Sequence, residues 1–162
     1  MTNAALDLIG DNVDVALRMG VRGDLERVER KLSPVDWQFC AGADWIKGKG
    51  VPASLKDITE FISPASDLRM FLEHFVLGGR ELPTGMITAD NQLMIRDLAL
   101  SGSGVALLPS GLCRDLIKSG RLITILPDIP IKAPVLNLTF PSRADITPRV
   151  RTFADVLAAQ FT

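Results

Sequence analysis

A short apolar run, Val105 to Leu108 (VALL), constrains the fold of this chain more than any other segment. It follows two glycines, Gly102 and Gly104, and it is followed by Pro109 and Ser110, which suit the start of a helix. A run that is apolar at every position is typical of a strand covered on both faces. Such a strand between two helical segments favours an α/β fold.

The rest of the chain alternates between strand-like and helix-like segments in the same way. Most of the predicted strands are apolar runs that end at or near Gly or Pro: 13–18, 37–41, 58–63, 68–77, 82–89, 105–108, 122–126 and 135–140. In 25–32 apolar residues alternate with charges, which suggests an exposed connecting strand. The predicted helices share capping signals: 3–10, a short one around 45, a turn from 52, 90–101, 109–120 and 147–161. This order predicts an α/β fold with largely parallel sheets, apart from a hairpin in which Gly78-Gly79 joins the runs 68–77 and 82–89.

The charge balance argues against a nucleic-acid surface on these residues. The sequence has 18 Lys and Arg against 19 Asp and Glu, whereas phosphate-binding domains usually carry a basic face. The most basic stretch, Arg22 to Lys31 (RGDLERVERK), mixes both signs and is typical of a solvated surface. We therefore expect no direct DNA binding by this part of the protein.

No motif for catalysis, metal binding or cofactor binding is found in the sequence. The single histidine, His74, lies in a strand-like run and is expected to be partly buried and structural. Cys40 and Cys113 are expected to be buried, reduced thiols, because two cysteines in a chain of this length make no disulfide framework. With no signal peptide after Met1 and no apolar window of membrane-spanning length, a cytoplasmic protein is expected. We predict no catalytic residues, no cofactor and no metal.

Polar residues and glycines follow several apolar strands, where ligands of open α/β sheets bind. Helix N-termini there attract anions, and an arginine can pair with a carboxylate, so a small anionic or polar ligand is expected. A purely structural role remains open for each of these residues. Arg18 could serve only to pair with Asp14, and Asn91 only to cap its helix. Gly102 and Gly104 could be there only because the backbone conformation requires glycine.

Four segments in order resemble the effector-binding domain of LysR-type transcriptional regulators, over nearly the whole chain. They are DLIGDNVDVALRMG (7–20), FCAGADWIKGKGVPASLKDI (39–58), SGSGVALLPSGLCRDLIKSGRLITILPD (101–128) and TPRVRTFADVL (147–157). The resemblance implies a periplasmic-binding-protein type II fold of two α/β lobes with an effector cleft between them. Residues 1–31 and 131–162 would form lobe one, and 32–130 lobe two.

The resemblance also implies which positions contact the effector. These are the turn after the first strand, the turn before the helix that starts near 90, and the loop before and after VALL: Arg18, Met19, Gly20, Thr88, Asp90, Asn91, Gly102, Ser103, Gly104, Leu108 and Pro109.

The family's winged helix-turn-helix, its linker helix and the start of lobe one have no counterpart in this sequence. DNA would be reached only through such an N-terminal domain. We therefore expect a truncated, ligand-sensing regulatory domain that forms a homo-oligomer, a dimer. The alternatives are a solute-binding protein of a transporter, a degenerate regulator fragment without effector binding, and an α/β enzyme of unrecognised chemistry.

Overall fold

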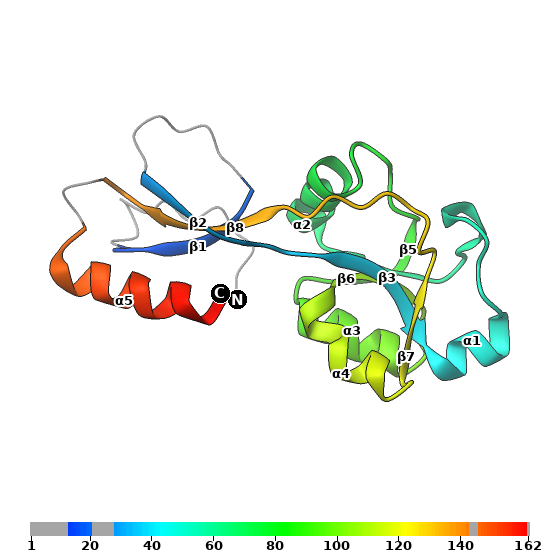
Figure 1. Ribbon diagram of the computed structural model, residues 1–162. Coiled ribbons are helices and arrows are strands. Elements are labelled where there is room, and N and C mark those ends of the chain that lie inside the picture. The colour runs from blue at the N-terminus through cyan, green and yellow to red at the C-terminus, as the bar shows by residue number, and fades with distance from the viewer. Residues whose placement is uncertain (1–12, 21–27, 143–145, 162) are drawn as a thin grey trace. The chain divides into compact units, whose positions relative to one another are not determined.

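A computed structural model describes residues 13–20, 28–142 and 146–161 of the chain (Figure 1). Contacts divide the chain into two compact units. One unit is Asp36–Ala133, and the other combines the described residues up to Val35 with those from Pro134 onward. The boundaries expected from the resemblance, 31/32 and 130/131, lie a few residues earlier. The helix expected at 3–10 is outside the described residues.

The smaller unit is a three-stranded antiparallel sheet with one long helix against it. The strands follow the order β1-β8-β2 and span Ala16–Met19, Val135–Phe140 and Val28–Pro34. Figure 1 shows α5 (Pro148–Ala158) along one side of this sheet, where Val150 and Ala154 pack against Leu138 and Phe140; the 3₁₀ turn η3 (Ala159–Phe161) follows it. As predicted, α5 begins with Thr147 as N-cap, whose side chain accepts a hydrogen bond from the Val150 N–H, and with proline in the first turn.

The larger unit is a five-stranded mixed sheet in the order β5-β4-β6-β3-β7. The strands span Trp37–Gly42 (β3), Phe61–Pro64 (β4), Gly85–Ala89 (β5), Val105–Pro109 (β6) and Leu122–Ile125 (β7). β4 runs parallel to β5 and β6, whereas β3 runs antiparallel to β6 and β7. The VALL run forms β6 at the centre of the sheet and is buried along its whole length, as its composition predicted.

Helices cover both faces of this sheet (Figure 1). α3 (Gln92–Leu100) and α4 (Ser110–Lys118) pack on the face that carries Cys40, Ile62 and Ala106. α2 contacts β4, and Figure 1 shows it on the other face. The remaining helical segments are short: α1 (Ala43–Lys49), the 3₁₀ turn η1 (Leu55–Asp57), α2 (Ser66–Phe71) and the π-helix η2 (Leu72–Val76).

The hairpin predicted for residues 68–89 is wrong. Residues 66–76 are helical, and β5 pairs in parallel with β4. The buried residues Leu68, Leu72 and Val76 recur every fourth position, which is a helical period. Gly78 and Gly79 do form a turn with positive φ, but the turn ends a helix instead of joining two strands.

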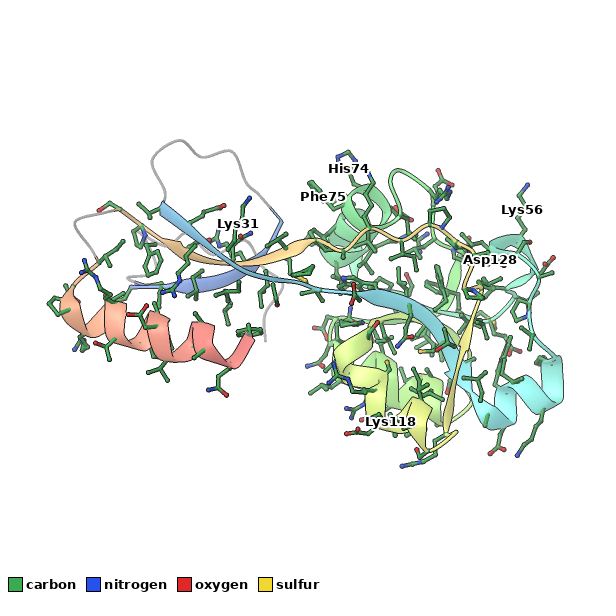
Figure 2. All side chains as sticks on the ribbon, viewed as in Figure 1. Lys31, Lys56, His74, Phe75, Lys118 and Asp128 are labelled. Carbon is green, nitrogen blue, oxygen red and sulfur yellow. The ribbon has the colours of Figure 1, made fainter. Side chains whose placement is uncertain are left out.

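Two other expectations need correction. His74 is exposed on the π-helix and was expected to be partly buried in a strand (Figure 2). The sheets are less parallel than predicted, because the three-stranded sheet is entirely antiparallel and β3 and β7 are antiparallel in the other.

In the part of the chain that the structure describes, no helix is long and apolar enough to cross a membrane.

Candidate functional site

The carboxyl ends of three parallel strands gather several of the predicted ligand-binding residues. β5 ends at Ala89, β4 at Pro64 and β6 at Pro109, and strands that run in parallel end on the same edge of a sheet. Thr88 pairs with Ser63 there, and α3 begins just beyond β5. Among the predicted residues, this edge holds Thr88, Asp90, Asn91, Leu108 and Pro109.

Asn91 caps α3. Its Oδ1 accepts a hydrogen bond of 2.8 Å from the backbone N–H of Leu93, so the side chain satisfies one of the free donors of the first turn. Asn91 therefore has the structural role considered from the sequence, which is to cap its helix. Leu108 is fully buried in the core beside α3 and α4, so a ligand at this edge can reach only its backbone.

Gln92, the first residue of α3, was missed by the sequence analysis. Both its Oε1 and its Nε2 are buried, and neither has a hydrogen-bond partner among the described residues. A buried amide without partners costs free energy, so this side chain keeps one donor and one acceptor for a ligand or a water molecule. The sequence places a polar residue in the first turn, but no local signal tells that its amide is buried.

The turn Arg18 to Gly20 lies in the other unit, at the end of β1. Arg18 pairs across the sheet with Asn137 of β8, and Lys31 of β2 pairs with Asn137 from the other side. Residues paired directly across strands point to the same face, so Arg18, Asn137 and Lys31 form one row with a cation at each end. Figure 2 labels Lys31 in this sheet. The row places two cationic side chains on the same face of the sheet, one of them at the end of β1.

Asn137 is the second residue that the sequence analysis missed. It is fully buried, and its Nδ2 donates to the backbone carbonyls of Gly20 (3.2 Å) and Val135 (3.1 Å). The Gly20 N–H in turn donates to Val135 O at 3.0 Å, and Gly20 has a φ of 77°, which favours glycine. The Oδ1 of Asn137 has no partner among the described residues. Nothing in the alternating strand VLNLTF distinguishes this asparagine as a positioning residue.

Gly102, Ser103 and Gly104 lie at the opposite edge of the larger sheet from Asn91 and Pro109. They precede β6, a strand of five residues, which spans about 16 Å at about 3.3 Å per residue. The expectation that this loop converges with the other residues of the unit therefore fails, because the same strand separates the two ends.

These glycines have structural roles at that edge. Ser103 N–H donates to Leu98 O and Gly102 N–H to Ala99 O, a hydrogen-bond pattern that ends α3 with Gly102 at a φ of 83°. Gly104 approaches the backbone of Glu60 so closely that a Cβ would lie 2.5 Å from the Glu60 carbonyl oxygen. Gly102 and Gly104 therefore have the structural role considered from the sequence, because both adopt backbone conformations that favour glycine.

Glu60 anchors this same edge through its side chain. It accepts a 2.6 Å hydrogen bond from Trp45 Nε1 and forms a 2.9 Å ion pair with Lys49. The Lys49 and Trp45 donors hold the pKa of the Glu60 carboxyl below its usual value. Across the described parts of the chain, no three His, Cys, Asp or Glu side chains group in a way that could hold a metal ion.

Comparisons with known proteins give one consistent result. A sequence model described as "LysR substrate binding domain" matches residues 1–162. PtxR, an HTH-type transcriptional regulator of Pseudomonas aeruginosa, is 30% identical over 165 residues, covering 93% of this chain and 50% of that protein. CrgA, an HTH-type regulator of Neisseria meningitidis, is 27% identical over 161 residues, covering 96% and 54%.

The fold also matches solved structures. The regulatory domain of CrgA superposes with a TM-score of 0.83 at 24% identity, over 99% of this chain and 81% of that chain. The chain spans about half the length of the curated relatives that it matches. These relatives are described as HTH-type transcriptional regulators.

Proposed function

This chain belongs to the LysR substrate-binding-domain family, and on that premise we propose that it senses a small anionic or polar effector for a transcription regulator. Its two-sheet α/β fold is that of the LysR regulatory domains, which is periplasmic-binding-protein type II-like. The effector itself is part of this proposal. We also propose that its binding is coupled to DNA binding through a helix-turn-helix part like that of the relatives.

The observation that carries the proposal is the start of α3 at the carboxyl edge of β4, β5 and β6. The first turn of a helix offers backbone N–H groups and a positive dipole end, and the unpartnered amide of Gln92 adds a donor and an acceptor. We assign effector contacts in this unit to Thr88, Asp90, Asn91, Gln92 and to the backbone of Leu108 and Pro109.

In the smaller unit we assign effector contacts to Arg18, Met19 and Gly20, with Asn137 as the residue that positions the turn. Arg18 and Lys31 at the two ends of one cross-strand row favour an anion, and arginine pairs with carboxylates through two parallel hydrogen bonds. The proposed effector class is therefore a small carboxylate. Residues 102–104 are left out of the proposal.

A thermal-shift screen with aliphatic and aromatic carboxylates, followed by calorimetric titration of the hits, tests this function. A binder at 100 times its Kd should stabilise the domain by about 2.7 kcal/mol. Arg18→Gln and Gln92→Met should each weaken binding about tenfold or more, which corresponds to about 1.4 kcal/mol. Arg114→Gln, which removes an exposed cation from α4, is the matched control and should leave affinity unchanged.

Two results would contradict the proposal. One is the absence of any stabilisation across the carboxylate series by a domain that unfolds cooperatively. The other is a carboxylate that binds the Arg18→Gln and Gln92→Met variants as tightly as the parent chain.

We further infer that a second copy of this chain covers the outer surface of β5 and α3. β5 is the last strand of the described sheet, so one of its edges lacks a described partner strand. Large apolar side chains are exposed on β5 itself and on the adjoining helix α3: Met86 (77% exposed), Ile87 (37%), Leu93 (48%) and Met94 (55%). A shallow hollow lined by Asn91, Leu93, Met94, Asp97 and Leu98 lies on the same helix. Exposed apolar groups of this kind are typical of protein–protein contacts.

Sedimentation over a range of concentrations tests this dimer. Met86→Lys and Met94→Lys should shift the equilibrium to monomers. Met70→Lys, at a methionine on α2 whose exposed fraction of 62% lies between those of Met86 and Met94, is the control and should not. Monomeric parent protein at all concentrations, or dissociation by Met70→Lys alone, would refute this surface as the interface.

A further inference from the structure

Strand β5 pairs with β4 through an irregular register. Phe61 pairs with Gly85, but the next residue of β4 pairs with Ile87, so Met86 is an extra residue on β5 and forms a β-bulge. A shift of one residue moves every following side chain to the other face of the sheet. The bulge therefore decides which residues of β5 lie on which face.

The bulge redirects Thr88, to which the proposed function assigns an effector contact. Beyond the bulge, Thr88 pairs with Ser63, on the face of the sheet that α2 covers. The next residue, Ala89, packs on the opposite face, in the core beneath α3 and α4. In a register without the bulge, Thr88 would take the place of Ala89 on that opposite face.

Burial of apolar side chains does little to fix this register. β5 is the last strand of the described sheet, and Met86, Ile87 and Thr88 are all exposed. Ala89 is buried, but its single methyl group contributes little apolar area. Register is weakly specified in a strand whose side chains are not buried. Polar contacts must therefore hold β5 in place.

The guanidinium of Arg69, on α2, ties the segment before β5 to the end of β4. Its Nη1 donates to Ser63 Oγ (3.1 Å) and to the Pro83 carbonyl (3.1 Å), and its Nη2 donates to the Leu82 carbonyl. Glu73, one helical turn further on, forms a 2.9 Å ion pair with Arg69 and accepts a 2.9 Å hydrogen bond from the Leu82 N–H. We refer to these contacts together as the Arg69 clamp.

The Arg69 clamp limits how far β5 can slide along β4. One planar group holds both Pro83, two residues before β5 begins, and Ser63, near the end of β4. Sliding by one residue would break these hydrogen bonds, and water would replace them poorly because the Arg69 and Glu73 side chains are only 27% and 23% exposed. A Cβ at Gly85 would lie 2.4 Å from Ser63 Cβ, so the strands also touch where the bulge begins.

We propose that Arg69 is a positioning residue of the effector site, because it sets the register of β5 and thereby the face of the sheet on which Thr88 lies. The effector contact of Thr88 rests on the proposed function, whereas the register does not. Lysine should not replace Arg69. Its ammonium keeps the charge but cannot bind the Ser63 hydroxyl and two carbonyls in the fixed plane of a guanidinium.

Cross-strand NOEs in the isotope-labelled full chain test the register without any ligand. In the parent chain they should join Ser63 to Thr88. Arg69→Met and Arg69→Lys should lose these NOEs and gain NOEs between Ser63 and Ile87, while NOEs between β3 and β6 persist and show that the fold is intact. Arg80→Met is the matched control, because it removes an exposed guanidinium from the segment between η2 and β5, and it should keep the parent pattern.

Two results would overturn the assignment of the register to Arg69. One is an Arg69→Met variant that keeps the NOEs between Ser63 and Thr88. The other is full rescue by Arg69→Lys, which would show that the charge alone is sufficient. Arg69→Lys is the milder change and decides the question by itself if Arg69→Met does not fold.

Binding measurements test whether the register matters to the effector. For a carboxylate that binds the parent chain, Thr88→Val removes the hydroxyl and should weaken binding about tenfold. Arg69→Met should weaken it by a similar factor, and the double variant should bind no more weakly than the weaker single variant. Losses that multiply in the double variant would overturn the route through Thr88. If the parent chain binds no carboxylate, the proposed function fails, and the NOEs still decide whether Arg69 sets the register.

Discussion

The side-chain amide of Asn137 donates a hydrogen bond to the backbone carbonyl of Gly20, at 3.2 Å, and so holds the turn that follows β1. Asn137 is fully buried on β8, the central strand of its sheet. The conformation of the turn that carries Arg18 therefore depends on a residue from near the other end of the sequence.

Replacing Asn137 by leucine should destabilise the domain. Leucine keeps the volume but removes the donor, so the Gly20 carbonyl loses its partner, and urea unfolding should show a loss of about 1–3 kcal/mol. Thr139→Val on the same strand is the control. Its buried Oγ1 has no partner among the described residues, so stability should stay the same or rise. Equal losses in both variants would contradict this account.

Gly104→Ala should be strongly destabilising. Gly104 has a φ of 146°, and a Cβ would lie 2.5 Å from the Glu60 carbonyl oxygen, so the backbone of β4 or the loop must move. We expect a loss of about 1–3 kcal/mol or more in the free energy of unfolding. Gly111→Ala is the matched control in α4, where a Cβ meets nothing, and it should gain about 0.5–1 kcal/mol. A neutral Gly104→Ala would show that the two backbones do not approach as described.

Loss of the α3 cap should cost about 1 kcal/mol. Asn91→Ala removes the acceptor of the Leu93 N–H, whereas Asn91→Ser keeps a side-chain oxygen in place. Chemical unfolding of the two variants, compared with the parent chain, measures the difference. If alanine and serine are equivalent, capping does not contribute at this helix.

Acid should destabilise the domain partly through Glu60. Because its folded-state pKa is lowered, Glu60 adds stability above its unfolded value, about 4.5, and this stability is lost as the pH falls through the folded pKa. Melting temperatures measured from neutral pH to about pH 3 should therefore fall less steeply for Glu60→Gln than for the parent. The glutamine retains an acceptor for Trp45 Nε1, which isolates the effect of charge. Parallel pH profiles would remove Glu60 as a source of acid sensitivity.

Several elements followed directly from the sequence. The VALL run predicted the central strand β6, and Thr147 with Pro148 predicted the start of α5. These signals act within a few residues, through periodicity and through caps that bind the nearest backbone groups. The order of the motifs along the chain was sufficient to predict the LysR family and its fold.

Strand pairing, burial and contacts between distant residues were decided only by the tertiary structure. Gly78-Gly79 makes a turn in either a hairpin or a helix end, and the pairing of β5 with β4 selects the second. Asn137 and Gln92 resemble ordinary residues in their local sequence. Asn137 gains its role because packing brings it near the Gly20 carbonyl, and Gln92 because packing buries its amide without a hydrogen-bond partner among the described residues. Local sequence specifies conformation, whereas burial and hydrogen bonding depend on residues that only folding places together.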